Sequence, residues 1–311
     1  MSEHTIIHCY DWPLESKTRM LRIAREFLDN GCRRFVFTCG NIQKALAHPE
    51  HLRFLKEEFV PRMGVELVAM HAPFGPLFDL NIPVPERRPG MIADHLRALE
   101  IAADFGSRTY TVHVGAYHHC LQNYPLPPLR KFARETLEVL LPRARELGVV
   151  IAVENGFEPP NTVPELLDLL RDFDFDPALG ICYDTGHANC RASAPWKKME
   201  DYPDYMLRDW LRDGRIITED DILAKLAPHV VTTHIHDNDG YRDLHGMPGD
   251  GTIDWKTLTP QLKACPRMLE FQSEVSPSEG MCWAGKLLAP AGGYSIKRLV
   301  DVFRDDLGFG L

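Results

Sequence analysis

The chain has 311 residues, 44% of them hydrophobic, and its 35 Lys and Arg stand against 44 Asp and Glu for a formal net charge of -9. This length suits one barrel of alternating strands and helices, and the negative charge argues mildly against nonspecific polyanion binding unless a local basic patch overrides it. No apolar run approaches the roughly 18 residues of a membrane span, and the N-terminus lacks a signal-peptide pattern, so neither membrane spanning nor secretion is expected.

Eight strand-like segments alternate with segments of helical periodicity along the chain. The strand-like segments are 5–10, 34–39, 65–70, 109–114, 149–153, 179–183, 230–235 and 268–275. The helical segments include 17–29, 91–105, 129–147, 163–171, 219–226 and 295–306. This alternation predicts parallel strands joined by crossover helices, and eight such strands predict a closed (β/α)₈ TIM barrel. Because no composition break divides the chain, we expect a single domain over residues 1–311.

Two segments look like additions to a plain barrel. Residues 190–218 are rich in aromatic and charged side chains, and residues 276–293 are rich in Gly and Pro. Both follow predicted strands directly, where lids over the active-site rim of a barrel would lie. The first segment has an alternative interpretation, in which it covers a hydrophobic patch or forms a subunit contact in a homo-oligomer.

Six predicted strands lead into residues with metal-binding side chains. These residues are His71, His113, Glu154, Asp184 with His187 three positions later, His234 and Glu274. Side-chain alternation places Val65, Leu67, Ala69 and His71 on one face of the third strand, Val150 and Ala152 with Glu154 on the fifth, and Thr232 with His234 and His236 on the seventh. We expect these faces to point into the barrel, with the polar residues at its C-terminal rim.

The segment 234–245, HIHDNDGYRDLH, concentrates such side chains most strongly. It holds His234, His236, Asp237, Asp239, Asp243 and His245. Imidazole nitrogens and carboxylate oxygens suit Zn²⁺, Mn²⁺ or Fe²⁺, and the PGDG turn that follows lets the loop fold back towards its strand. A polar surface loop that merely contains several histidines is the alternative. The recurrence of the same residue types at other strand ends favours a metal site.

The cysteines indicate a reducing compartment. The eight are Cys9, Cys32, Cys39, Cys120, Cys182, Cys190, Cys265 and Cys282. They form no CxxC pair, and several fall on predicted strands, so we interpret them as reduced core thiols and expect a cytoplasmic protein.

The order and spacing of several short motifs resemble one superfamily. The motifs are HAPFG, HVG, VEN, DTGHAN, HIHDN, DLH and GDGTIDW. Together they are similar to the xylose-isomerase-like TIM barrel superfamily, which contains sugar and sugar-phosphate isomerases and epimerases as well as the zinc-dependent apurinic-site nuclease endonuclease IV. The resemblance runs from residue 71 to residue 274.

The resemblance to the epimerases implies one divalent metal ion, Mn²⁺, Zn²⁺, Mg²⁺ or Fe²⁺, held by four residues. By motif position these are Glu154, Asp184, His234 and Glu274. Glu270 shares a strand face with Glu274 and is its rival. Glu274 is preferred because relatives place this Glu at a similar distance beyond the second Gly of the GxG motif, and because it lies nearer the rim. Glu270 would lie deeper, as a buried polar partner.

The resemblance to the nuclease implies up to three zinc ions. The further ligand types of that enzyme match His71, His113, His187, Asp243 and His245. Sugar-processing relatives use several such residues to hold substrate hydroxyls. We therefore predict that these five residues, with His236, are additional metal ligands or substrate contacts.

The residues suit proton abstraction next to a carbonyl, through an enediolate stabilised by a divalent cation. Glu154 and Glu274 would act as base and acid on the two faces of a small sugar, and His187 would hydrogen-bond a hydroxyl, polarise a carbonyl or orient Asp184. The sequence predicts a metal-dependent sugar or sugar-phosphate isomerase or epimerase. The alternatives are a keto-sugar lyase, dehydratase or glycoside-cleaving enzyme with the same enolate chemistry, a zinc-dependent apurinic endonuclease, and a noncatalytic metal or ligand binder.

The charges of the predicted rim loops favour a small carbohydrate substrate over nucleic acid. The basic residues there are Arg87, Arg88, Arg191, Lys197, Lys198 and Arg242, and the acidic ones are Asp79, Glu86, Glu158, Glu200, Asp201 and Asp204. A DNA backbone would require a continuous basic surface, whereas these signs are mixed.

Overall fold

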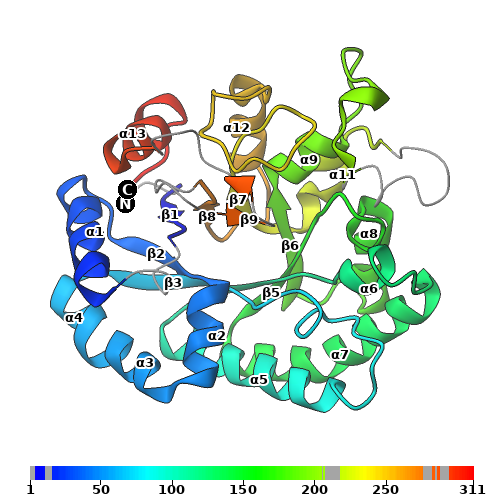
Figure 1. Ribbon diagram of the computed structural model, residues 1–311, viewed down its shortest axis with the longest axis horizontal. Helices are drawn as coiled ribbons and strands as arrows, with labels where there is room; N and C mark the ends of the chain where they lie inside the picture. The colour runs from blue at the N-terminus through cyan, green and yellow to red at the C-terminus, as the bar shows by residue number, and fades with distance from the viewer. Residues whose placement is uncertain are drawn as a thin grey trace.

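A computed structural model describes residues 4–10, 16–204, 206, 218–275, 282–283, 286–287 and 294–311. Eight parallel strands close into a barrel in chain order, with helices around it (Figure 1). The strands are β1 (Ile6–His8), β2 (Arg34–Phe37), β3 (Glu66–His71), β4 (Thr109–Val112), β5 (Val150–Glu154), β6 (Leu179–Asp184), β7 (Val230–Ile235) and β8 (Phe271–Ser273). The predicted (β/α)₈ barrel is confirmed.

Helices surround the barrel (Figure 1), and α1 (Lys17–Asp29) is clearly amphipathic. The α-helices are α1 (Lys17–Asp29), α2 (Cys39–Ala47), α3 (Pro49–Phe54), α4 (Val60–Met63), α5 (Arg88–Asp104), α6 (Tyr117–Cys120), α7 (Leu126–Leu147), α8 (Val163–Asp172), α9 (Thr185–Arg191), α11 (Ile222–Leu226), α12 (Trp255–Lys263) and α13 (Ile296–Asp301). In α1 the Ser16 side chain caps the N-terminus by accepting from Arg19 N–H, and Met20, Ile23 and Phe27 are buried at helical spacing.

The predicted strand 34–39 is too long at its C-terminal end. Strand β2 ends at Phe37, and Cys39 already begins α2. A nearly continuous helical run follows, because Pro49 fits the first turn of α3 and Gly64, with a φ of 68°, ends α4 in the left-handed conformation.

A β-bulge reverses the faces that alternation predicts for β3. Phe35 pairs with Leu67, but the next residue, Val36, pairs with Ala69 and skips Val68. Val65 and Leu67 accordingly pack in the main core with helix residues. Ala69 belongs instead to a small cluster with Ile7 and Val36 inside the barrel. The expectation that Val65 and Leu67 point inward is therefore wrong, while His71 still does, because the bulge shifts the alternation by one residue.

Strand β7 contains a second irregularity of the same kind. Ile181 pairs with Val230, and Cys182 pairs with Thr232, so Val231 is skipped. Val230 packs in the main core, whereas the Thr232 hydroxyl accepts at 2.9 Å from Nε2 of Gln272, on the neighbouring strand β8. Thr232 and His234 thus share the inward face, as alternation predicts.

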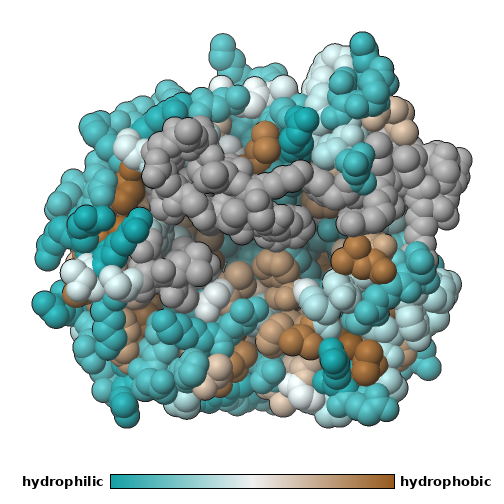
Figure 2. Space-filling view, in the orientation of Figure 1, coloured by the Kyte–Doolittle hydropathy of each residue, from teal (hydrophilic) through white to brown (hydrophobic). Residues whose placement is uncertain are grey.

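The first and last described segments of the chain lie side by side (Figure 1), where Thr5 and Gly310 form a parallel bridge. Among the residues that Figure 2 colours by hydropathy, most are hydrophilic, and hydrophobic residues gather in several places on this face. None of the described helices combines the length and apolar character needed to cross a bilayer.

Candidate metal centre

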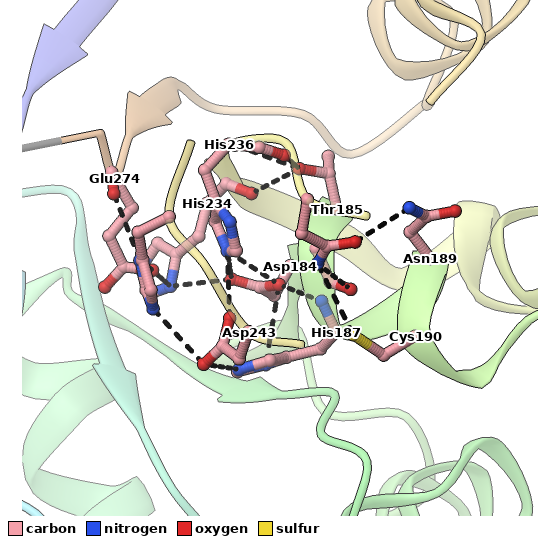
Figure 3. Close-up of polar contacts among 12 residues, drawn as sticks. Asp184, Thr185, His187, Asn189, Cys190, His234, His236, Asp243 and Glu274 are labelled. Carbon is pink, nitrogen blue, oxygen red and sulfur yellow. Dashed lines mark hydrogen bonds and ion pairs between the residues drawn. The ribbon is translucent and has the colours of Figure 1, made fainter. Parts of the chain in front are cut away.

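Four side chains from neighbouring strand ends meet at the C-terminal rim, and Figure 3 labels three of them, Asp184, His234 and Glu274. They are Glu154 at the end of β5, Asp184 at the end of β6, His234 on β7 and Glu274 just after β8. One ligand-type atom of each lies within 4.8 Å of those of the other three. Glu154, Asp184 and His234 are buried, and the Glu274 side chain keeps 18% of its surface exposed. This set is the one that the sequence predicts as metal ligands.

The His234 side chain tests whether these residues fit a cation. Its Nδ1 atom is buried and has no hydrogen-bond partner among the described residues. It lies 3.3 Å from Glu154 Oε2 and 3.3 Å from Glu274 Oε2. Two ligands bound to one tetrahedral ion at about 2.1 Å are roughly 3.4 Å apart. The spacing and the donor types therefore fit a divalent ion.

A second group shares the Glu154 carboxylate. The Nε2 atoms of His71 and His113 lie 3.6 Å and 3.1 Å from Glu154 Oε2. Phe74 stacks on the His113 ring, with 4.5 Å between ring centroids, and thus forms an apolar wall beside this group. Glu154 can therefore bridge two adjacent cation positions.

A third group consists of His187, Asp243 and His245. The Nε2 atoms of both histidines are 3.3 Å from Asp243 Oδ2. His245 has a φ of 47°, in the left-handed region, which is uncommon for a residue with a side chain and is frequent at functional sites. The structure thus brings every predicted ligand-type residue to the same end of the barrel.

Three of these histidines have the same orientation. The Nδ1–H groups of His71, His187 and His245 donate to the backbone carbonyls of Ala72, Asn155 and Glu274 at 2.7, 2.9 and 3.1 Å. Because a carbonyl oxygen only accepts, each neutral ring presents an unprotonated Nε2 to a carboxylate. Two lone pairs facing one another repel unless a proton or a metal ion lies between them. This is how outer partners hold metal-binding imidazoles.

The electrostatics of the rim also favour positive charge. Burial lowers the pKa of His245, but Asp243 and Glu274 outweigh it and raise this pKa to about 10. Burial likewise opposes charge on Glu154, yet His234 and His113 hold its pKa well below the ordinary value. The carboxylates therefore remain ionised and attract either protons on the histidines or a metal ion.

Glu270 lies apart from these groups. It is buried in the barrel interior, where its Oε1 accepts from Gln272 Nε2 at 3.0 Å and from the Thr109 hydroxyl. Burial raises the pKa of its carboxyl to about 7, although those two hydrogen bonds lower it. The geometry thus gives Glu270 the contacts of a buried polar partner.

Asp237 organises the loop that carries Asp243 and His245. Its carboxylate accepts from Gly249 N–H at 2.9 Å and from Trp255 Nε1 at 2.8 Å. A Cβ on Gly251 would lie 2.2 Å from Asp237 Oδ1, so only glycine fits there. The GDGTIDW motif therefore folds this loop around a buried carboxylate, a role that the sequence analysis did not assign to Asp237.

Asn155 is a second residue that the sequence analysis missed. Its amide oxygen accepts from Asp184 N–H at 2.9 Å, and its Nδ2 donates to Asp184 O at 3.0 Å. This pair of bonds fixes the backbone at the end of β6. Its position directly after Glu154 in the VEN motif was the available signal.

The segments predicted as lids are described only in part. Within 190–218 the described residues Cys190, Tyr202 and Met206 pack with Phe157 in a small apolar cluster. The two ends of this segment lie next to each other, because Ala192 forms a β-bridge with Glu219. Residues 207–217 lie outside the described residues. So do residues 276–293, apart from the antiparallel pair β9 (Cys282–Trp283) and β10 (Lys286–Leu287). A covering role for both segments stays a prediction.

Barrel closure and a C-terminal rim rich in ligand-type side chains together define a (β/α)₈ barrel with a candidate metal centre. Residues 37–270 match the protein family described as xylose isomerase-like TIM barrel, and the chain belongs to this family. The superfamily that the motifs predict is confirmed.

Similar proteins agree with this fold. An uncharacterized protein from Methanocaldococcus jannaschii is 30% identical over 225 residues, which cover 69% of this chain and 66% of that protein. A solved 3-keto-D-glucoside 4-epimerase from E. coli has a TM-score of 0.65 and 17% identity, over 97% of this chain and 98% of that one. A solved D-tagatose 3-epimerase-like protein has a TM-score of 0.64 and 22% identity, over 88% of this chain and 90% of that one. At these identities the solved structures show a shared fold.

Proposed function

We propose that the protein is a divalent-metal-dependent isomerase or epimerase of small sugars that removes a proton next to a carbonyl. The observation that carries this proposal is the meeting of Glu154, Asp184, His234 and Glu274 around the unpartnered Nδ1 of His234. A divalent ion held there would supply a positive charge opposite the substrate oxygen. The two solved structures above have names of sugar epimerases, which supports a carbohydrate substrate.

The two glutamates are suited to different parts of the proton transfer. Glu274 is the more open of the two, with 18% of its side chain exposed, and can approach a substrate carbon. Glu154 is 4% exposed and is contacted by His113, His187 and His234. With the substrate between them, one carboxylate removes the proton from one face of the substrate. The other carboxylate acts as the acid or base on the opposite face. His187, at 12% exposure, would hydrogen-bond a substrate hydroxyl.

Contacts of the basic rim residues support a small ligand rather than DNA. Arg88 donates to Ile82 O and Phe132 O, and Arg191 donates to Phe157 O. Lys197 Nζ donates to the carbonyls that end α9, and Arg242 pairs with Asp239. These four basic side chains bind carbonyl groups or a carboxylate of the protein itself, which leaves them less available to a DNA backbone.

Exchange of substrate protons tests the proposal. Incubation with ketoses and 3-keto-glycosides in D₂O and Mn²⁺ should place deuterium on the carbon next to the carbonyl. Glu154→Gln should reduce the exchange by at least about 100-fold, because general acid–base catalysis contributes that much. Glu100→Gln, on the outer ion pair with Arg97, is the matched control and should exchange at the wild-type rate. Exchange that persists in Glu154→Gln contradicts the assigned role.

A phosphodiesterase is the second candidate, and one observation favours it. The groups around Glu154 and Asp243 bring nine ligand-type residues together, as the resemblance to endonuclease IV implies. Metal analysis of the purified protein should then give three zinc ions per chain, and abasic-site DNA should be cut. One ion per chain and uncut DNA are expected if the sugar enzyme is the correct assignment.

A further inference from the structure

His236 is a fully buried histidine in direct contact with Asp184 (Figure 3). Its Nε2 lies 3.0 Å from Asp184 Oδ2 and 3.2 Å from Asp184 Oδ1. Its ring also stacks on the His245 ring, with centroids 4.1 Å apart and planes 12° apart. One imidazole therefore contacts two of the groups that form the rim.

The protonation of this ring follows from its partners. A carboxylate only accepts, so His236 Nε2 carries the proton and donates it to Asp184. The Nδ1 atom is then unprotonated, and it is buried with no hydrogen-bond partner among the described residues. The adjacent Cε1 would lie 2.0 Å, and Nδ1 2.5 Å, from a Cβ on Gly186, so this edge of the ring packs against the chain at Gly186.

Two residues of the DTGH motif position His236, one through its backbone and one through its ring. The Thr185 hydroxyl accepts from His236 N–H at 3.0 Å and donates to His236 O at 2.6 Å. At Gly186 the ring packs so closely that a Cβ would lie 2.0 Å from His236 Cε1. The second residue of this motif thus fixes the backbone of His236, and the third leaves room for its ring.

We infer that His236 is a positioning residue that orients the Asp184 carboxylate and the His245 ring for the ion, and is not itself a ligand. This inference rests on the proposed metal centre. Outer hydrogen-bond partners of metal ligands typically contribute 10- to 100-fold in metal affinity. The glycine of DTGH is required because it makes space for this imidazole.

Metal binding by the purified protein tests the inference, with Mn²⁺ and Co²⁺ as probes and the visible spectrum of Co²⁺ as a report on geometry. His236→Ala should weaken binding by about 10- to 100-fold and change the Co²⁺ spectrum, without loss of an equivalent of metal. His236→Gln keeps an N–H for Asp184 and should bind within a few-fold of wild type. Gly186→Ala should weaken binding by displacing the ring, and adding it to His236→Ala should cost little more.

His95→Gln is the matched control, because His95 is also buried and bonded twice, to the Tyr110 hydroxyl at 2.8 Å and to Phe78 O at 2.7 Å. It should lower the melting temperature but leave metal affinity and the spectrum unchanged. Wild-type binding by His236→Ala, or the loss of one whole equivalent with the remaining affinity intact, overturns the inference. A wild-type protein that binds no metal overturns the proposed function instead.

Discussion

Glu274 and Glu270 lie four residues apart, and their surroundings give them different roles. Glu274 Oε2 is 3.3 Å from the unpartnered His234 Nδ1, whereas Glu270 accepts hydrogen bonds from Thr109 and Gln272. Glu274→Gln should therefore weaken metal binding by more than the roughly 100-fold typical of an outer partner, since a charged ligand is lost. Glu270→Gln should retain its metal. Metal content of the two purified variants decides, and the opposite pattern would exchange the two assignments.

The buried Glu270 carboxyl should also make stability depend on pH. Burial raises its pKa to about 7 in the folded chain, above the ordinary value of 4.5. The native state therefore holds this proton more tightly than the unfolded chain, so the stabilisation is complete below about pH 4.5 and is lost as the pH rises through about 7. The loss amounts to about 3 kcal/mol.

Glu270→Gln should remove this component, because an amide does not ionise in this range. Relative to wild type, its free energy of unfolding should rise by about 3 kcal/mol between pH 4.5 and pH 8.5. Urea unfolding of both proteins at the two pH values measures the difference. A constant difference between them would mean that Glu270 titrates normally in the folded protein.

At the scale of elements, the sequence predicted those whose signals are local. The helical periodicity of residues 17–29 predicts α1, and the structure gives this helix the same bounds, Lys17–Asp29. The inward face of β3 was not predicted correctly, because the bulge at Val68 depends on how β3 pairs with the neighbouring strand β2. Helix α9 was missed because it begins directly at the strand end, where Asp184 caps it by accepting from His187 N–H at 2.6 Å.

The candidate site was predicted in the same uneven way. Ligand-type residues such as Glu154 and His234 stand at strand ends, and the fold of a parallel barrel brings strand ends together. The contacts of Asp237 and His236 depend on a loop folded back on itself, whose hydrogen bonds no periodicity reports. The residue types at strand ends therefore predicted where the candidate site lies. Tertiary contacts decide which side chains point into it and which support the loop.

The loop after β7 should depend on Gly251. A Cβ there would lie 2.2 Å from both Asn238 O and Asp237 Oδ1. Gly251→Ala should therefore destabilise the protein by about 1–3 kcal/mol, as overpacking does, and should disturb Asp243 and His245. Gly90→Ala is the control, since nothing lies within 4 Å of its added Cβ. Urea unfolding and metal content compare the two, and equal stabilities would show that the loop relaxes around the new methyl group.

At the scale of the whole molecule, self-association stays a prediction. The exposed large apolar residues of the described chain are Leu77, Leu121, Val139, Phe175, Trp196 and Met199. Single exposed apolar residues are ordinary on monomers, so they do not mark one interface.

The candidate centre joins the ends of four neighbouring strands, which make up half of the barrel, so an ion held there should stabilise the whole fold. Its four predicted ligands come from β5, β6, β7 and the end of β8, and without an ion the buried carboxylates of Glu154 and Asp184 repel one another. An ion present at 100 times its dissociation constant adds about 2.7 kcal/mol to stability. Removing it with EDTA should lower the melting temperature by roughly 4 °C. Glu274→Gln, already short of a ligand, should show little further change with EDTA. Identical melting of the wild type with and without EDTA would mean that these carboxylates and histidines are held together by protons alone.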